Sequence, residues 1–168
     1  MIEIVFTAST SELFGAHMVG AIAIKLIQGK CNSAGLSPFI MTTRILLISD
    51  IHGNYPALQA IDRELDSGSF DRIINCGDSL VYAPFPNRTL LWLRSRKTLS
   101  ILGNTDKKVI KLVNCKSFKK PGKEDKRVMY TTTADALTRE NCRFLMSLPK
   151  ATKLTLNVST SADRSETV

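Results

Sequence analysis

The chain has 168 residues, 43% of them hydrophobic, and a formal net charge of +8 at pH 7. This length fits about one domain, and the apolar content is enough to build a core, which excludes a wholly disordered chain. The four cysteines lie far apart without a C-x-x-C pair, which excludes a cysteine-based zinc site and favours a reducing, cytoplasmic setting. They are Cys31, Cys76, Cys115 and Cys142.

Residues 1–40 carry no net charge, show no clean helical or strand period, and end in the turn formers "CNSAGLSP". We interpret 1–40 as an N-terminal extension, 41–158 as the domain and 159–168 as a disordered tail. The apolar stretch 13–27 contains His17 and Lys25 and is shorter than the ~20 residues that span a bilayer, so we predict no membrane insertion. It also lacks a preceding basic region, so we expect no signal peptide.

Apolar runs and helical patterns alternate from residue 44 onward. The apolar runs cover 44–48, 72–77 and 99–103, and the helical patterns cover about 56–65 and 87–96. Asn54 is a good helix N-cap, and Pro56 falls in the first turn, where its missing N–H costs nothing. Trp92 is expected to pack in the core. This alternation predicts an α/β fold with a mostly parallel sheet and flanking helices.

The pattern continues less regularly after the third apolar run. A helix is expected from Asp106 to Val113, followed by a loop at Pro121 and Gly122. Thr138 is the expected N-cap of a further helix, and the alternating "TKLTLNV" predicts a strand.

Polar residues follow each of the three apolar runs. Asp50 and His52 follow the first run, Asp78 the second, and Asn104 and Asp106 the third. Because the carboxyl ends of neighbouring parallel strands line one crevice, these side chains are expected to converge. Glycines at 53, 77 and 103 are expected to let the backbone turn beside them.

Carboxylate and imidazole ligands of this kind suit Mn, Fe, Zn or similar divalent ions. Two such ions about 3.5–4 Å apart can clamp an in-line displacement at phosphorus. Each motif alone is a common turn or helix entry. Their ordered occurrence at successive strand ends favours a metal site.

The motifs "SDIHGN", "NCGDSLVYAPFPN" and "ILGNTD" resemble, in order and spacing, the calcineurin-like metallophosphoesterase superfamily, in particular its small phosphodiesterase-like branch. The resemblance covers about residues 44–150 and implies an incomplete α/β sandwich of that type. It implies that Asp50 and His52 hold one metal, that Asp78 bridges, and that Asn104 binds the second metal and contacts the phosphate. Asn54 and Asp106 are expected to support these ligands.

The resemblance implies a metal-dependent hydrolase of phosphomonoesters or phosphodiesters, with two divalent ions from among Mn, Fe, Zn, Ni and Mg. The chain departs from the family in two places. Thr105 stands where many members have a proton-donating histidine, and the later His-Gly and G-H-x-H motifs have no counterpart after His52. We therefore expect a domain truncated at its C-terminus, with reduced or no activity, whose exposed sheet edge favours a homo-oligomer.

The alternative is an inactive fold that binds nucleic acid, or another phosphate-bearing partner, through residues 107–127. This segment carries nine basic residues against two acidic ones, a local net charge of +7. Lysine and arginine contacts to phosphates would give weak, salt-dependent binding. A dinucleotide-binding fold would need a glycine-rich turn after the first run, where "DIHGNYP" supplies one glycine.

Overall fold

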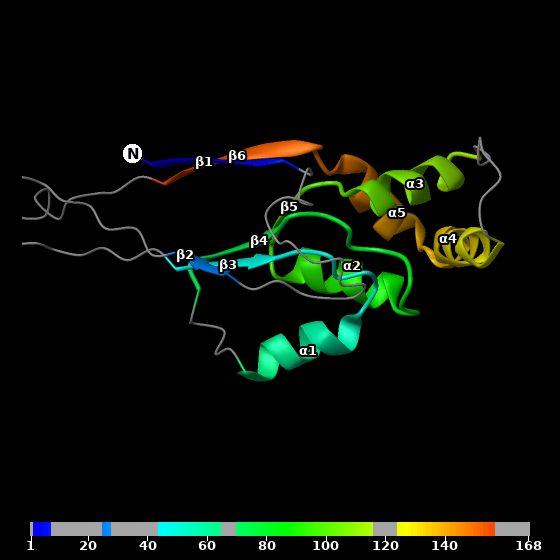
Figure 1. The fold of residues 1–168 in the computed structure, drawn as a ribbon, viewed down its shortest axis with the longest axis horizontal. Coiled ribbons are helices and arrows are strands. Elements are labelled where there is room, and N and C mark those ends of the chain that lie inside the picture. Colours follow the sequence, from blue (N-terminus) through cyan, green and yellow to red (C-terminus); the bar gives the residue numbers. More distant parts are fainter. Residues whose placement is uncertain (1, 8–24, 28–43, 65–69, 116–123, 157–168) are drawn as a thin grey trace, which may run out of the picture.

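The computed structural model describes residues 2–7, 25–27, 44–64, 70–115 and 124–156. Its strands are β1 (Ile2–Thr7), β2 (Lys25–Ile27), β3 (Ile45–Ile48), β4 (Arg72–Asn75), β5 (Leu99–Ser100) and β6 (Ala151–Leu156). Its helices are α1 (Tyr55–Glu64), α2 (Pro86–Ser95), α3 (Asn104–Val113), α4 (Glu124–Ala136) and α5 (Arg139–Ser147). Figure 1 shows α3, α4 and α5 grouped at one end of the molecule.

The main sheet has the strand order β2-β3-β4-β5, in which β3, β4 and β5 are parallel. β2 pairs with β3 in the antiparallel direction. The prediction of an α/β fold with a mostly parallel sheet is therefore confirmed. β1 and β6 form a separate antiparallel pair, drawn as a two-stranded ribbon in Figure 1.

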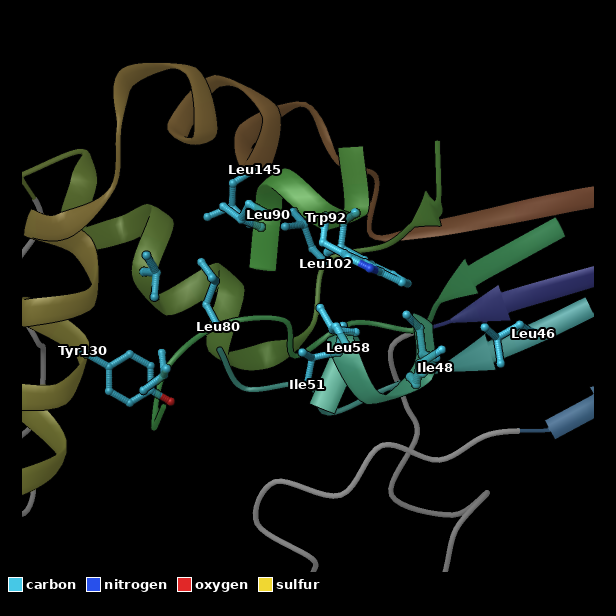
Figure 2. Close-up of a cluster of buried hydrophobic side chains, with 14 residues drawn as sticks. Leu46, Ile48, Ile51, Leu58, Leu80, Leu90, Trp92, Leu102, Tyr130 and Leu145 are labelled. Carbon is cyan, nitrogen blue, oxygen red and sulfur yellow. The ribbon is translucent and has the colours of Figure 1, made fainter. Parts of the chain in front are cut away.

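The side chains of β3 alternate between two hydrophobic clusters, as the period of two in a strand requires. Leu46 and Ile48 point into a large cluster that also receives the helices, and Trp92 is a member of it with 5% exposure (Figure 2). Ile45 points to the other face, where it packs with Ile74 and Ile101 in a smaller cluster. Both faces of the sheet are thus covered, as is usual for parallel sheets.

The first two helices begin for the reasons that the sequence indicates. The Asn54 side chain accepts a hydrogen bond from the backbone N–H of Ala57 at 3.2 Å, and Pro56 lies in the first turn of α1. Leu58 and Ile61 then fall on the buried side of α1, one helical turn apart. α2 begins with a proline, Pro86, at its first position. The predicted helices over about 56–65 and 87–96 are therefore confirmed, with boundaries shifted by about one residue.

The remaining elements are one unpredicted helix and three strands whose pairing the sequence left open. α4 was not predicted, because few of its side chains are apolar and its buried residues are Tyr130 and Thr133. The strand predicted near the C-terminus is confirmed as β6, and it pairs with β1 outside the main sheet. β1 and β2 both fall within residues 1–40, the segment interpreted as an extension, and β2 contributes an edge strand.

Several other expectations fall on residues outside the described part. These are most of the apolar stretch 13–27, the loop at Pro121 and Gly122, and the tail 159–168. No helix in the described ranges combines the length and apolar character needed to cross a membrane. The basic segment 107–127 lies partly on α3 and α4, with 116–123 outside the description, and nucleic-acid binding and homo-oligomer formation stay predictions.

Candidate metal centre

The loops that follow β3 and β4 run side by side at the carboxyl edge of the sheet. The backbone N–H of Asp50 donates to the Gly77 carbonyl at 3.1 Å, and that of His52 donates to the Asp78 carbonyl at 3.0 Å. A further bond of 2.8 Å joins the N–H of Gly53 to the Ser79 carbonyl. This ladder continues the strand pairing beyond the strands and fixes the two loops relative to each other.

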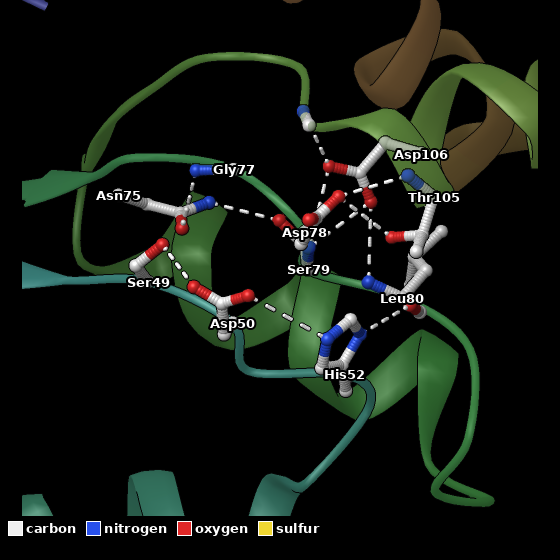
Figure 3. A network of polar contacts seen from close by, with 11 residues as sticks. Ser49, Asp50, His52, Asn75, Gly77, Asp78, Ser79, Leu80, Thr105 and Asp106 are labelled. Atoms are coloured by element: carbon white, nitrogen blue, oxygen red, sulfur yellow. Dashed lines mark hydrogen bonds and ion pairs between the residues drawn. The ribbon is translucent and has the colours of Figure 1, made fainter. Parts of the chain in front are cut away.

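Asp50, His52 and Asp78 come together at this edge. Each offers one ligand atom, and these atoms lie within 4.8 Å of one another (Figure 3). His52 is buried, with 7% exposure, while the two carboxylates are half-buried. The convergence that the strand-end argument predicted is thus present for the three residues.

The imidazole of His52 is oriented by a backbone carbonyl. Its Nδ1 lies 3.2 Å from the Leu80 carbonyl oxygen, and its Nε2 lies 3.7 Å from Asp50 Oδ1. Because a carbonyl only accepts, we assign a proton to Nδ1, and Nε2 faces the Asp50 carboxylate. A metal-ligating histidine is commonly oriented in this way.

The two carboxylates are also each held through one oxygen. Asp50 Oδ2 accepts a hydrogen bond of 2.7 Å from the hydroxyl of Ser49. Asp78 Oδ1 accepts from both the backbone N–H of Thr105, at 2.8 Å, and its hydroxyl, at 3.0 Å. In each carboxylate, one oxygen is therefore anchored by donors from the protein and the other is available to a ligand.

This donor set fits a divalent cation. Nε2 of His52 and Oδ1 of Asp50 face each other 3.7 Å apart, so one cation could be bound by both. Two carboxylate oxygens and one imidazole nitrogen suit Mn, Fe, Zn or similar ions. Asp50, His52 and Asp78 are the residues that could hold such an ion.

Asp106 connects the loops after β4 and β5. It is fully buried; its Oδ1 accepts hydrogen bonds from the N–H groups of Ser79 (3.0 Å) and Leu80 (3.1 Å), and its Oδ2 accepts one from Gly103 (3.0 Å). Burial raises the pKa of Asp106 to about 6, although these backbone donors act in the opposite direction. Since Leu80 also holds His52, Asp106 fixes the backbone that orients the imidazole.

The backbone around the three ligands is strained. Asp50, His52 and Asp78 have φ values of 54°, 51° and 53°, in the left-handed region that residues with a Cβ seldom adopt. Val81 and Tyr82, in the loop after β4, follow with φ values of 78° and 76°. Strain of this kind persists only where surrounding contacts hold it, and it is concentrated at functional sites.

Gly77 and Gly103 lie where a neighbouring loop leaves no room for a Cβ atom. Gly77 has φ of 103°, a conformation that favours glycine. Gly103 has φ of −76°, which any residue can adopt, so the expectation that it provides a sharp turn is wrong. A Cβ at Gly103 would lie 2.1 Å from both the backbone nitrogen and Oδ1 of Asp78. Gly103 is therefore required because the Asp78 ligand approaches it so closely.

The remaining predicted site residues lie at the beginnings of helices. Asn104 is the first residue of α3 and its side chain is exposed, next to the Thr105 that anchors Asp78. Asn54 caps α1, two residues after His52. Roles for Asn104 in metal or phosphate binding and for Asn54 in support stay predictions.

Sequence reasoning missed three groups that organise the site. These are the hydroxyl of Ser49, the carbonyl of Leu80 and the paired donors of Thr105. Tyr82 also contacts His52, with its ring in an edge-on arrangement 4.8 Å away between centroids. A backbone carbonyl leaves no signal in a sequence, but the polar residues Ser49 and Thr105 directly beside predicted ligands were a signal that could have been used.

Comparison with known proteins agrees with this geometry. Residues 43–150 match the sequence profile of the family described as calcineurin-like phosphoesterase. The uncharacterized protein MJ0912 of Methanocaldococcus jannaschii is 31% identical over 110 residues, which is 66% of this chain and 44% of that protein. A crystal structure of a metallophosphoesterase from Sphaerobacter thermophilus is 30% identical, with a TM-score of 0.51, over 64% of this chain and 42% of the other.

The present chain thus spans less than half the length of either of these relatives. The family match itself covers well over half of this chain and includes all three residues of the candidate metal centre. The profile, the fold and the strand-end ligands agree, and the chain belongs to the calcineurin-like phosphoesterase family.

Proposed function

We propose that this chain carries a metal-dependent phosphoesterase site that hydrolyses a phosphomonoester or phosphodiester. The observation that carries the proposal is the triad of Asp50, His52 and Asp78, in which each ligand is oriented through its other polar atom. Because the chain spans less than half of its relatives' length, the complete activity is part of the proposal.

In this mechanism the protein's residues hold the cation and the phosphate in a fixed geometry. Asp50, His52 and Asp78 bind a divalent ion, which when present polarises the phosphoryl group and makes water a better nucleophile near neutral pH. The exposed amide of Asn104 contacts a phosphoryl oxygen or a second ion. No side chain forms a covalent bond to phosphorus, so the reaction is a direct displacement by water.

Thr105 has a positioning role in this proposal. Its hydroxyl donates to Asp78 Oδ1, and the residue is 4% exposed, so it is committed to the carboxylate. A threonine hydroxyl is also too weak an acid to protonate a leaving group at neutral pH. We therefore expect the enzyme to favour substrates whose leaving groups need little protonation, such as aryl phosphates.

The proposal is tested with Asp78→Asn, which keeps the size of the side chain and removes its charge. Hydrolysis of p-nitrophenyl phosphate and of bis(p-nitrophenyl) phosphate is measured with added Mn. We expect the rate of hydrolysis to fall at least about 100-fold in the variant. Loss of a direct metal ligand should reduce the rate at least as much as loss of a residue that only orients a ligand. Asp135→Asn, which changes an exposed acid on α4, is the matched control.

Calorimetric titration with Mn gives a second measurement that does not depend on turnover. We expect the wild type to bind Mn and Asp78→Asn to bind it at least about 10-fold more weakly, since the triad loses one of its two charges. Equal rates and equal affinities in the two proteins would contradict the proposed function.

A further inference from the structure

Arg88 contacts two aromatic rings, those of Tyr55 and Phe85. Its guanidinium carbon is 5.8 Å from the centroid of the Tyr55 ring and 5.9 Å from that of Phe85. Both distances fall within the range of cation–π attraction. Tyr55 is the first residue of α1 and Phe85 is the N-cap of α2, so rings from two elements define where the guanidinium sits.

The loops that carry these rings also carry the predicted ligands. Tyr55 follows His52 by three residues, and Phe85 ends the loop that begins after Asp78. The two loops touch here, because the N–H of Ala83 donates to the His52 carbonyl at 2.9 Å. Arg88 therefore contacts one ring from each of the two segments that follow these loops.

The position of Arg88 is electrostatically unfavourable within its own helix. It is the third residue of α2, and the amino end of a helix carries partial positive charge that disfavours a cation. Neither α1 nor α2 has an acidic residue in its first turn, whereas α3, α4 and α5 all do. Neither of the first two helices thus supplies a carboxylate in its own first turn to offset the positive potential at its beginning.

Two arginines at the C-terminal end of α2, Arg94 within the helix and Arg96 at its C-cap, form ion pairs, whereas Arg88 forms none with the described residues. Arg94 forms an ion pair with Glu140, and Arg96 forms one with Asp62. Within the part of the chain that the structure describes, no carboxylate pairs with Arg88 and no hydrogen bond engages its guanidinium. Arg88 is thus an exposed cation that two aromatic rings contact and no described carboxylate neutralises, so its guanidinium is free to bind an anion.

We propose that Arg88 is a specificity residue that binds a second phosphate group of the substrate, apart from the phosphate that is hydrolysed. The inference rests on the proposed function and names its substrate class, a phosphate ester that carries a further phosphate. The planar guanidinium can donate two parallel hydrogen bonds to phosphate oxygens. Stacking against Tyr55 and Phe85 limits its freedom before binding, which lowers the entropy lost when phosphate binds.

The kinetic test compares two substrates that differ in one phosphate. They are the p-nitrophenyl ester of thymidine 5′-phosphate and the same ester with an added 3′-phosphate, assayed with Mn. In Arg88→Gln we expect kcat/KM to fall about 10-fold for the 3′-phosphorylated ester and less than about twofold for the other. An equal loss on both esters, or none on either, would overturn the inference.

Arg63→Gln is the matched control, because Arg63 is an exposed arginine at the far end of α1 and its replacement removes the same charge. We expect it to change kcat/KM for neither ester. A loss on the 3′-phosphorylated ester that is as large in Arg63→Gln as in Arg88→Gln would mean that net charge alone is responsible, and would also overturn the inference.

A binding measurement separates this inference from the proposed function. Nuclear magnetic resonance of the arginine Nε–H groups is followed while methylenediphosphonate is added to the full chain with Mg²⁺ present. We expect the Arg88 signal to shift in a saturable way and the Arg63 signal to stay in place. An Arg88 signal that does not move overturns the inference even if esters are hydrolysed, whereas saturable binding without hydrolysis contradicts only the proposed function.

Discussion

The loops that follow β3, β4 and β5 form a loop cluster that depends on contacts between distant residues, whereas helix α5 depends on local signals. In the loop cluster, the three metal-ligand candidates have left-handed backbone, and their loops are joined by hydrogen bonds between residues far apart in the sequence. α5 begins at a local signal, because the Thr138 hydroxyl accepts a hydrogen bond of 3.3 Å from the N–H of Asn141. Glu140 then provides the acidic first turn that suits the helix dipole.

This difference shows that tertiary contacts determine the backbone conformation in the loop cluster, whereas local preferences determine it in α5. Left-handed backbone is uncommon for residues with a Cβ, and although aspartate and histidine adopt it more often than most, local preference alone does not fix it at three ligands. The contacts of Leu80, Thr105 and Asp106 hold these residues in place, so the geometry depends on all three strand ends at once. A change in the loop cluster should therefore affect stability and metal binding together, and a change in α5 should affect stability alone.

The largest effect is expected for Gly103→Ala. The added methyl group would lie 2.1 Å from Asp78 Oδ1 and from the Asp78 backbone nitrogen, so the two loops must move apart. We expect a loss of more than about 3 kcal/mol in the free energy of unfolding. The affinity for Mn should fall in the same variant, because Asp78 shifts away from His52. Urea denaturation and calorimetric titration measure the two losses.

The control for this variant is Ser147→Thr, which also adds one methyl group but does so on an exposed side chain of α5. Its expected effect on unfolding is within about 0.5 kcal/mol, and Mn affinity should not change. A Gly103→Ala protein that binds Mn as tightly as the wild type would mean that the contact with Asp78 does not fix the ligand.

A smaller and pH-dependent effect is expected from Asp106. Its pKa is raised from 3.8 to about 6 in the folded chain, so between these values the folded state binds more protons than the unfolded state. Stability must then fall as the pH rises from about 4 to about 6, by at most about 3 kcal/mol from this group. Urea denaturation with a chelator present isolates the effect from metal binding.

Asp106→Asn provides the comparison, because its amide does not titrate and the other acidic residues contribute equally to both proteins. The difference in unfolding free energy between wild type and variant should change across this pH range, with the wild type losing relative stability as the pH rises. A constant difference between pH 4 and pH 6 would show that the three backbone donors compensate for the burial of the charge.

Much of the parallel sheet and the ligand triad could be predicted from the sequence. The runs around Ile45, Ile74 and Ile101 are apolar because the sheet is covered on both faces, and a polar residue after each run marks the carboxyl edge. The helix signals at Asn54 and Thr138 are local hydrogen bonds, so they can be read from neighbouring residues. These features follow from short-range chemistry.

The features that the sequence did not reveal depend on long-range contacts. α4 buries Tyr130, whose ring contacts Lys108 of α3 and Tyr82 of the loop after β4, and its own pattern is only weakly amphipathic. β2 was missed because three residues are too few to show a period of two. The space requirement at Gly103 arises from Asp78, 25 positions away, and no local rule distinguishes it from a turn glycine.

The smallest effect is expected at the beginning of α5, which a local hydrogen bond determines. Thr138→Ala removes the N-cap hydrogen bond of α5, and we expect a loss of about 1 kcal/mol in the free energy of unfolding. Affinity for Mn should stay within about twofold of the wild type, because no metal-ligand candidate depends on α5 for its orientation. Thr138→Ser retains the hydroxyl and should recover most of the stability. If Thr138→Ala weakened Mn binding as strongly as Gly103→Ala, the loop cluster and α5 would be a single cooperative unit, and the contrast between them would fail.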